Sequence, residues 1–327
     1  MRYLITGGAG FIGSHLAEEL LQRGDSVTVL DNFSTGAHEN LKRAEQSERF
    51  KLVYGSVTDK ELVTECVKGV DKVYHLASAV GVKLIIEKPI ETIETIVEGA
   101  SIVFGACARY RLPVLLTSTS EVYGKSEALP FCEDSDSIIG PPKYRRWAYA
   151  SAKALDEFLA LAYWHQIKLP VVLVRLFNTV GPRQTGQYGM VIPRLIRQAL
   201  AGQPLTVYGD GNQSRCFCHV NDAVRALIEL LDQPECAGEL FNVGSTEHIT
   251  IAELAKKIIA ETGSSSEISY VPYEEAYGQG FEDMRHRVPS LDKIEAQIGY
   301  KTEHNLSSII QCIVSHEQGN DANTRLP

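Results

Sequence analysis

Short apolar runs alternate with stretches of helical periodicity through the first half of the chain. The runs, which predict β-strands, lie at residues 3–5, 26–30, 51–54, 72–75, 113–117 and 170–176. Helical spacing of apolar residues starts at Ser14 and recurs over 89–110 and 147–165. Strands that alternate with helices in this way are typical of an α/β protein with a doubly wound parallel sheet of the Rossmann type.

The pattern changes after Phe177, where loops and short strands separate predicted helices at 191–201, 220–231, 251–262 and 306–316. A chain of 327 residues is longer than one ordinary domain. We therefore predict a sheet domain over 1–177, to which about 217–245 returns. A smaller mixed α/β substrate-binding domain is expected over 178–216 and 246–316, followed by a polar tail over 317–327.

A glycine-rich turn joins the first apolar run to the first helix. Gly7, Gly10 and Gly13 surround Phe11 and Ile12, and the helical pattern follows directly. A strand, a glycine turn and a helix in succession let the backbone approach a pyrophosphate at the positive end of the helix dipole. Glycines alone could form only a tight turn, but in this setting they predict a dinucleotide site.

The second strand is followed by Asp31 and Asn32, where an acidic side chain meets the adenosine ribose in dinucleotide-binding folds. A carboxylate at this point repels the additional phosphate of NADP, so the predicted cofactor is NAD. Ligands of open parallel sheets lie beyond the carboxyl ends of the strands. The turns after the next two strands therefore supply the other expected cofactor contacts, Ser56, Val57, Leu76 and Ala77.

Tyr149 and Lys153 lie four residues apart in a predicted helix, so they share one face of it. An ammonium group near the phenol lowers the pKa of the tyrosine. The phenolate can then take a proton from a substrate hydroxyl while a hydride leaves the same carbon for NAD. This spacing occurs by chance in many helices, but here it follows a dinucleotide fingerprint, and both residues are also expected to contact the cofactor.

Composition narrows the class of partner. The chain has 44% hydrophobic and 22% charged residues and a net charge of −9, without the basic excess of nucleic-acid-binding proteins. No apolar run approaches the length of a membrane span, and a core strand stands where a signal peptide would. The seven cysteines are scattered and odd in number, so we expect no disulfide framework, no metal site and a cytoplasmic location.

Together with segment 118–124, these motifs resemble the extended short-chain dehydrogenases that modify nucleotide sugars, over nearly the whole chain. The resemblance implies NAD as cofactor, a UDP-sugar substrate and a homodimer formed through the helices that begin near 89 and 147. In this family the hydroxyl at the position of Thr119 bridges the tyrosine and the sugar O4. Ser120, a substrate contact by the same match, replaces the aspartate of sugar 4,6-dehydratases, which argues against dehydration.

Glu121 completes a Thr-Ser-Glu sequence like that of UDP-glucuronate decarboxylases. Segment 143–149 resembles their approach to the catalytic tyrosine. Segment 280–290 resembles the part whose arginine faces the reacting carboxylate, and this match assigns that role to Arg287. The alternative is that Arg285 or Arg287 forms a surface ion pair or binds phosphate.

The resemblance implies a concrete reaction. Tyr149 deprotonates O4 of UDP-glucuronate while NAD accepts the C4 hydride, which gives a 4-keto sugar whose carboxylate is β to the ketone. Such an acid loses carbon dioxide because the electrons delocalise into an enolate. Glu121 and Arg287 orient the carboxylate and assist protonation at C5. Hydride return gives UDP-xylose, whereas early loss of NADH leaves the 4-keto pentose.

Substrate contacts also follow from the resemblance. Asn178 matches an asparagine that contacts the nucleotide diphosphate, and Arg215 matches a phosphate-binding arginine. A planar guanidinium donates paired hydrogen bonds that suit a diphosphate. Val191 and Tyr208 fall where the uracil and its ribose are enclosed.

Three departures from the family pattern bear on the cofactor and sugar sites. Ser56 stands where an aspartate often meets adenine, Ile96 replaces a common asparagine, and the stretch 80–83 resembles no decarboxylase closely.

Two other functions stay open. A 4-epimerase acting on UDP-glucose or UDP-glucuronate uses the same Tyr149, Lys153 and Thr119, and rotates the keto sugar before the hydride returns. A non-catalytic NAD sensor would not need Tyr149 or Lys153.

Overall fold

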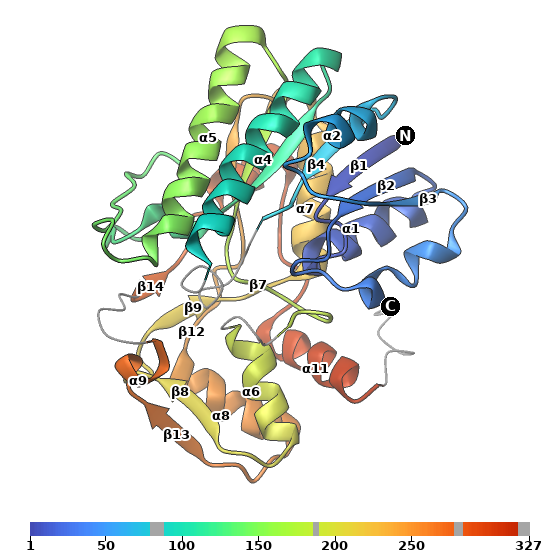
Figure 1. Ribbon diagram of the computed structural model, residues 1–327. Helices are drawn as coiled ribbons and strands as arrows, with labels where there is room; N and C mark the ends of the chain where they lie inside the picture. The colour runs from blue at the N-terminus through green and yellow to red at the C-terminus, as the bar shows by residue number, and fades with distance from the viewer. Residues whose placement is uncertain (79–87, 186–189, 278–283, 320–327) are drawn as a thin grey trace.

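The computed structural model describes residues 1–78, 88–185, 190–277 and 284–319. Its largest element is a seven-stranded parallel sheet (Figure 1) of order β11-β6-β5-β4-β1-β2-β3. The strands are β1 (Arg2–Thr6), β2 (Ser26–Asp31), β3 (Phe50–Tyr54), β4 (Lys72–His75), β5 (Val114–Thr119), β6 (Val171–Leu176) and β11 (Leu240–Val243). The predicted doubly wound α/β fold is confirmed.

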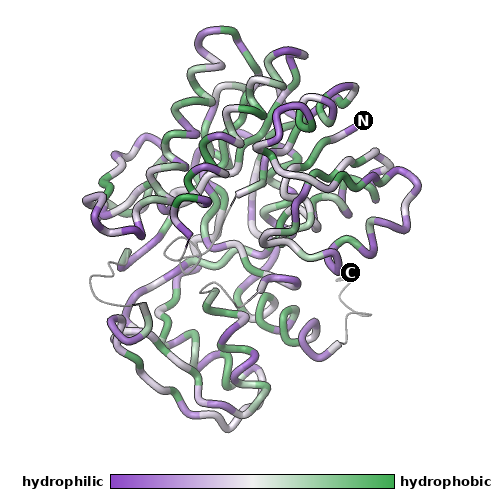
Figure 2. The backbone as a smooth tube through the Cα atoms, viewed as in Figure 1, coloured by the Kyte–Doolittle hydropathy of each residue, from purple (hydrophilic) through white to green (hydrophobic). Residues whose placement is uncertain are grey.

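Helices cover both faces of the sheet (Figure 1). One layer contains α1 (Phe11–Gln22) and α7 (Val220–Asp232), and the other contains α2 (Lys60–Val67), α4 (Pro89–Tyr110) and α5 (Trp147–Ile167). Hydrophobic stretches alternate with hydrophilic turns along these elements (Figure 2). None of the helices in the described part of the chain is both long and apolar enough to cross a membrane.

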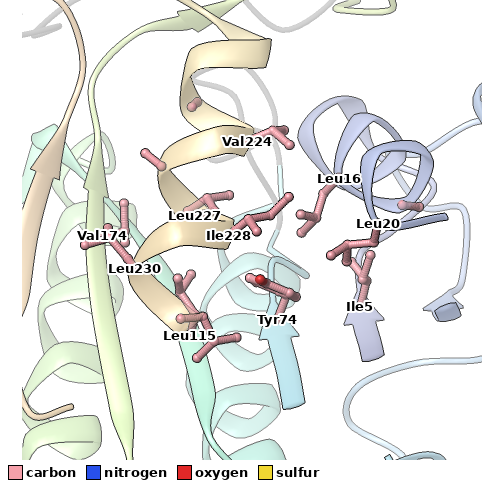
Figure 3. Packing of buried hydrophobic residues seen from close by; sticks show 14 of the residues in the cluster. Ile5, Leu16, Leu20, Tyr74, Leu115, Val174, Val224, Leu227, Ile228 and Leu230 are labelled. Atoms are coloured by element: carbon pink, nitrogen blue, oxygen red, sulfur yellow. The ribbon is translucent and has the colours of Figure 1, made fainter. Parts of the chain in front are cut away.

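The alternation of side chains along each strand divides the core into two layers. Ile5 and Leu115 pack with α1 and α7, whereas their neighbours Leu4 and Leu116 pack with the other helix layer. All four of these strand residues are fully buried. Figure 3 shows the first layer, where side chains of α1 and α7 meet those of β1, β4, β5 and β6.

The first helix begins at Phe11, three positions before the expected Ser14. Gly10 is extended and is the N-cap, and the first helical hydrogen bond runs from Ser14 N to Gly10 O at 3.1 Å. The glycine fingerprint therefore leads directly into the helix terminus. This places the first-turn N–H groups, which have no intrahelical partner, at the carboxyl edge of the sheet.

A smaller mixed α/β unit lies at that edge (Figure 1). Its strands form three small sheets, in which β10 (Cys218–His219) pairs with β7 (Thr179–Val180), β13 (Ile268–Val271) with β8 (Leu205–Tyr208), and β9 (Ser214–Cys216) with both β12 (His248–Thr250) and β14 (His286–Arg287). Its core is built around α6 (Val191–Leu200), α8 (Ile251–Thr262) and α11 (Leu306–Glu317).

Short elements complete the described chain: α9 (Tyr273–Tyr277), α10 (Asp292–Ile298), and the 3-10 helices η1 (His38–Leu41), η2 (Ala44–Gln46), η3 (Ser120–Tyr123) and η4 (Pro234–Cys236). Glu317, expected to open the polar tail, is instead the last residue of α11. Its carboxylate pairs with Arg197 of α6 at 2.7 Å, which extends the helix to this point. Residues 320–327 of that tail lie outside the described part.

Truncating a side chain at the centre of the sheet tests this packing. Leu115→Ala removes methyl groups from a fully buried site, and we expect it to lower the free energy of unfolding by about 2–5 kcal/mol. Urea titration followed by circular dichroism measures the change. The matched variant Ile138→Ala, at a side chain that is 49% exposed, should cost less than about 1 kcal/mol. Equal losses for the two variants would contradict the core assignment.

Candidate active site

A cleft of about 440 Å³ follows the carboxyl edge of the sheet and continues between it and the smaller unit. It is lined by all but one of the site residues predicted from the sequence: Gly7, Gly10, Phe11, Ile12, Gly13, Asp31, Asn32, Ser56, Val57, Leu76, Ala77, Thr119, Ser120, Glu121, Tyr149, Asn178, Val191, Tyr208, Arg215 and Arg287. Lys153 is the exception, and its side chain is almost completely buried. Residues distant in sequence thus meet at one continuous surface.

The glycine turn at one end of the cleft has no room for side chains. Gly7 has a φ of +73°, and a Cβ on it would lie 2.7 Å from Ala77 Cα. A Cβ on Gly13 would collide with the carbonyl oxygen of Gly7. Gly10 caps α1 without any side-chain hydrogen bond. Backbone N–H groups at the positive end of a helix therefore border an open cradle, which fits the pyrophosphate of a dinucleotide.

Asp31 organises the neighbouring turn. Its Oδ2 accepts a hydrogen bond from Ala9 N at 2.8 Å, and its Oδ1 accepts one from Phe33 N at 2.7 Å. Burial raises the pKa of this carboxyl above its usual value, and the two N–H donors oppose that rise. Asp31 and Asn32 line the cleft beside the glycine turn, a placement that suits contact with ribose hydroxyls.

Ser56 stands where the resembling family often has an aspartate, and its hydroxyl makes hydrogen bonds within its own turn. Ser56 Oγ lies 2.8 Å from Thr58 Oγ1 and accepts a hydrogen bond from Thr58 N at 3.2 Å. It still lines the cleft next to Val57. The side chain therefore shapes the turn after β3 as well as the cleft wall.

Tyr149 lines the cleft together with Thr119 and Glu121, and we call this part of the cleft its reacting end. It is 7% exposed and packs with Ile96 and Ala152. Burial raises the pKa of the phenol well above its ordinary value, and the negative charge of Glu121 adds to the rise. The hydroxyls of Ser78 and Thr119 act in the opposite direction. A phenol in this surrounding needs a nearby positive charge before it can ionise at neutral pH.

Lys153 supplies a positive charge one helical turn along α5. Its Nζ donates a hydrogen bond to Asp156 Oδ2 at 3.0 Å, and both side chains are almost completely buried. The sequence analysis did not single out Asp156. The signal was available, because residues three apart on a helix are neighbours on its surface.

Glu121 is held between two guanidinium groups. Arg146 Nη1 lies 3.2 Å from Glu121 Oε2, and Arg287 Nη1 lies 3.3 Å from Glu121 Oε1. The three side chains are at most 12% exposed and come from η3, the start of α5 and β14. Arg146 lies in segment 143–149, and the sequence analysis assigned it no role of its own. Arg285, in contrast, is 75% exposed and pairs with Asp210 at 3.3 Å, so the surface ion pair belongs to Arg285.

The far end of the cleft combines aromatic and basic groups. The guanidinium of Arg194 lies over the ring of Tyr208 at 4.3 Å, and Arg194 also donates to Thr206 O at 2.7 Å. Arg215 donates to Ser214 O at 2.8 Å. Arg194 was not predicted, because only the pairing of α6 with β8 brings it to the cleft. The stretch 80–83 and residues 280–283 of the decarboxylase-like segment lie outside the described residues.

The similarity to known proteins covers nearly the whole chain. The family model described as GDP-mannose 4,6 dehydratase matches residues 4–313. The UDP-N-acetyl-alpha-D-glucosaminuronate decarboxylase of Bacillus cytotoxicus is 47% identical over 298 residues, 90% of either chain. UDP-glucuronic acid decarboxylase 1 of Danio rerio is 35% identical over 99% of this chain and 75% of its own.

Solved structures agree with the fold. The UDP-glucuronic acid 4-epimerase of Bacillus cereus, in complex with UDP-glucuronic acid and NAD, is 26% identical and superposes with a TM-score of 0.88 over 98% of this chain and 99% of its own. The glycine cradle, the buried tyrosine and lysine on α5 and these similarities converge. The chain belongs to the extended short-chain dehydrogenases that modify nucleotide sugars, within the GDP-mannose 4,6 dehydratase family.

Proposed function

We propose that this protein is an NAD-dependent enzyme that decarboxylates a UDP-linked hexuronate. The observation that carries the proposal is the placement of Glu121 between Arg146 and Arg287 at the reacting end of the cleft, which also holds Tyr149. Guanidinium groups recognise carboxylates through charge-assisted hydrogen bonds. The names of the decarboxylase relatives support the same reaction.

The cofactor proposed is NAD. The cradle of Gly7, Gly10 and Gly13 would hold its pyrophosphate, and Asp31 its adenosine ribose. Bound NAD supplies the acceptor for the hydride of sugar C4 and later its donor. The negative charge of Asp31 disfavours NADP. Structural relatives with bound NAD support this assignment.

Tyr149 is the base that we assign to the sugar O4 hydroxyl, and Lys153 stabilises its phenolate. Thr119 Oγ1 accepts a hydrogen bond from Glu121 N at 3.2 Å. That bond uses the oxygen and leaves the hydroxyl hydrogen to donate toward Tyr149 or the sugar. Proton removal from O4 and hydride loss from C4 convert the alcohol into a ketone.

Carbon dioxide then leaves from C5. The bond between C5 and the carboxylate carbon breaks, and its electron pair moves into the C4 carbonyl as an enolate. The hydroxyl groups of Tyr149 and Thr119 stabilise the oxygen that gains this charge, because both can donate a hydrogen bond to it. Arg287 orients the carboxylate before it leaves, and Glu121 fixes Arg287. Protonation at C5 and return of the hydride to C4 give a UDP-pentose.

The substituent at C2 separates two substrates of this class. The sequence resemblance points to UDP-glucuronate, whereas the relative at 47% identity is named for the N-acetylated sugar. Asn178, Arg215, Val191 and Tyr208 are proposed to bind the UDP part that both substrates share. We propose residues 178–216 and 246–316 as the substrate-binding domain, set against the sheet domain.

A 4-epimerase is the alternative, supported by similarity to UDP-glucuronic acid 4-epimerases at 26% identity. Such an enzyme needs the same base and cofactor but must retain the carboxylate. The Thr-Ser-Glu sequence and the 35–47% identity to decarboxylases favour carbon dioxide loss.

We further propose a homodimer in the cytoplasm. The helices α4 and α5 pack against each other and expose large apolar side chains, with Ile90 at 72%, Leu155 at 51% and Phe158 at 75% exposure. Burial of such side chains against a second copy would form a four-helix interface. Ile93 of α4 is also 40% exposed, whereas Val103 of the same helix is core. All seven cysteines are free thiols, which supports a reducing compartment.

The reaction itself is tested by mass spectrometry of the purified protein with UDP-glucuronate or its 2-acetamido analogue, with and without added NAD. We expect a product lighter by carbon dioxide from at least one of the two sugars, as pentose or 4-keto pentose. A new chromatographic peak of unchanged mass would identify a 4-epimerase. No conversion of either sugar would overturn the proposal.

Arg287→Gln removes the guanidinium proposed to face the carboxylate. We expect kcat/KM for decarboxylation to fall by about 10²-fold or more, because a buried charge-assisted contact is lost. The control is Arg285→Gln, two positions away and exposed, which should retain activity within about threefold. A similar small effect for both variants would contradict the role of Arg287.

Gly13→Ala tests the cofactor cradle. The added methyl group collides with the carbonyl oxygen of Gly7, so the turn must open and its N–H groups must move. We expect NAD to bind at least about tenfold more weakly by calorimetry. Gly105→Ala, on α4, places its Cβ 3.7 Å from the nearest side-chain atom and should leave affinity unchanged. Equal NAD affinity in the wild type, Gly13→Ala and Gly105→Ala would refute the placement of the pyrophosphate at the glycine turn.

A further inference from the structure

The counter-ion of Lys153 is not used by the mechanism above. Lys153 and Asp156 lie one turn apart on α5, with Nζ and Oδ2 separated by 3.0 Å. Their side chains are 2% and 1% exposed. An ion pair at such depth carries a large desolvation penalty, so removal of either partner leaves the other charge uncompensated.

The second carboxylate oxygen of Asp156 is also buried and has no hydrogen-bond partner among the described residues. Burial raises the pKa of this carboxyl, and Lys153 opposes that rise. Buried carboxylates of purely structural use have their lone pairs satisfied in most proteins. The lysine is therefore the main partner that this carboxylate has.

The other described ionisable groups near the pair do not compensate the charge of Lys153 in place of Asp156. His75 at the end of β4 is neutral, since burial and the nearby Lys153 lower its pKa to about 3. The carboxylate of Glu157 is committed to Arg175 and Ser118. Glu121 acts on Tyr149 and pairs with arginines. Of the described carboxylates, Asp156 alone contacts the ammonium.

We propose that Asp156 is a positioning residue that fixes the ammonium group of Lys153 behind Tyr149. A lysine has three N–H donors. One of them donates to Asp156 Oδ2. The other two make no hydrogen bond within the described residues and can serve a ribose hydroxyl of the cofactor and Tyr149. The inference rests on the roles proposed above for Tyr149, Lys153 and NAD.

The sign of the expected effect follows from the charges. Asp156→Asn keeps the shape of the side chain but removes the negative charge that holds the ammonium group of Lys153 in place. The same change lowers the pKa of Tyr149, because the charge of Asp156 raises it. The limb of the pH profile of kcat/KM that reports the ionisation of Tyr149 therefore moves toward lower pH.

The test measures NAD affinity by calorimetry at about pH 8, without any sugar, and then the pH profile of kcat/KM. In Asp156→Asn we expect NAD to bind at least about tenfold more weakly than in the wild type, because the ammonium group of Lys153 is no longer fixed. Asp156→Glu restores the charge and should return the NAD affinity toward the wild-type value. Because no sugar is present in the first measurement, failure of the decarboxylase assignment does not affect it.

Asp222→Asn is the matched control, since it removes a buried carboxylate that pairs with Arg225 three residues along α7 and does not line the cleft. This variant should lose thermal stability without a change in NAD affinity. An unchanged NAD affinity in Asp156→Asn would overturn the proposal. Asp156→Ser is a second neutral variant, and failure of both neutral variants to fold while Asp222→Asn folds would assign the pair a structural role alone.

Discussion

The geometry of the reacting groups depends on one buried carboxylate, that of Glu157. It accepts two hydrogen bonds from Arg175 of β6, at 3.0 and 2.7 Å, and one from Ser118 of β5. These contacts join α5 to two adjacent strands. Thr119 directly follows Ser118, and Tyr149 stands two turns before Glu157 on the same helix. The relative position of the hydroxyl and the phenol is therefore set by an interaction outside the cleft.

The same network extends to η3, the 3-10 helix that contains Glu121. The guanidinium of Arg175 lies 4.6 Å from the centre of the Tyr123 ring. The Tyr123 hydroxyl donates to Asn242 Oδ1 at 2.7 Å, which ties η3 to β11. Networks of this kind, in a region of low dielectric, rigidify the groups that they join. Charges at the site are accordingly compensated inside the protein, by Asp156 for Lys153 and by two arginines for Glu121.

Local signals made much of this molecule predictable from its sequence. Helix α4 has the bounds that its apolar spacing predicts, and the glycine turn lies where its spacing places it. Tyr149 and Lys153 were found because four-residue spacing is itself a contact on a helix. The start of α1 was missed by three positions, because Phe11 and Ile12 already belong to the helix rather than to the turn.

Residues that meet through the tertiary structure were harder to predict. Arg194 reaches the cleft only because α6 packs on β8, and Arg183 holds Ser14 and Glu18 of α1 from a loop far along the chain. Arg146 and Arg287 meet at Glu121 although β14 lies far from α5 in sequence. Family resemblance identified Arg287, but no spacing rule could show that Arg146 shares its carboxylate.

The most direct test of the central claim is a structure of the protein with NAD and a non-reacting UDP-hexuronate analogue. The account predicts that O4 lies within hydrogen-bond distance of Tyr149 Oη and that the sugar carboxylate contacts Arg287, with Glu121 displaced or shared. A carboxylate that points away from Arg287, with C4 still facing the nicotinamide, would contradict the assignment of Arg287 and Glu121 to carbon dioxide loss.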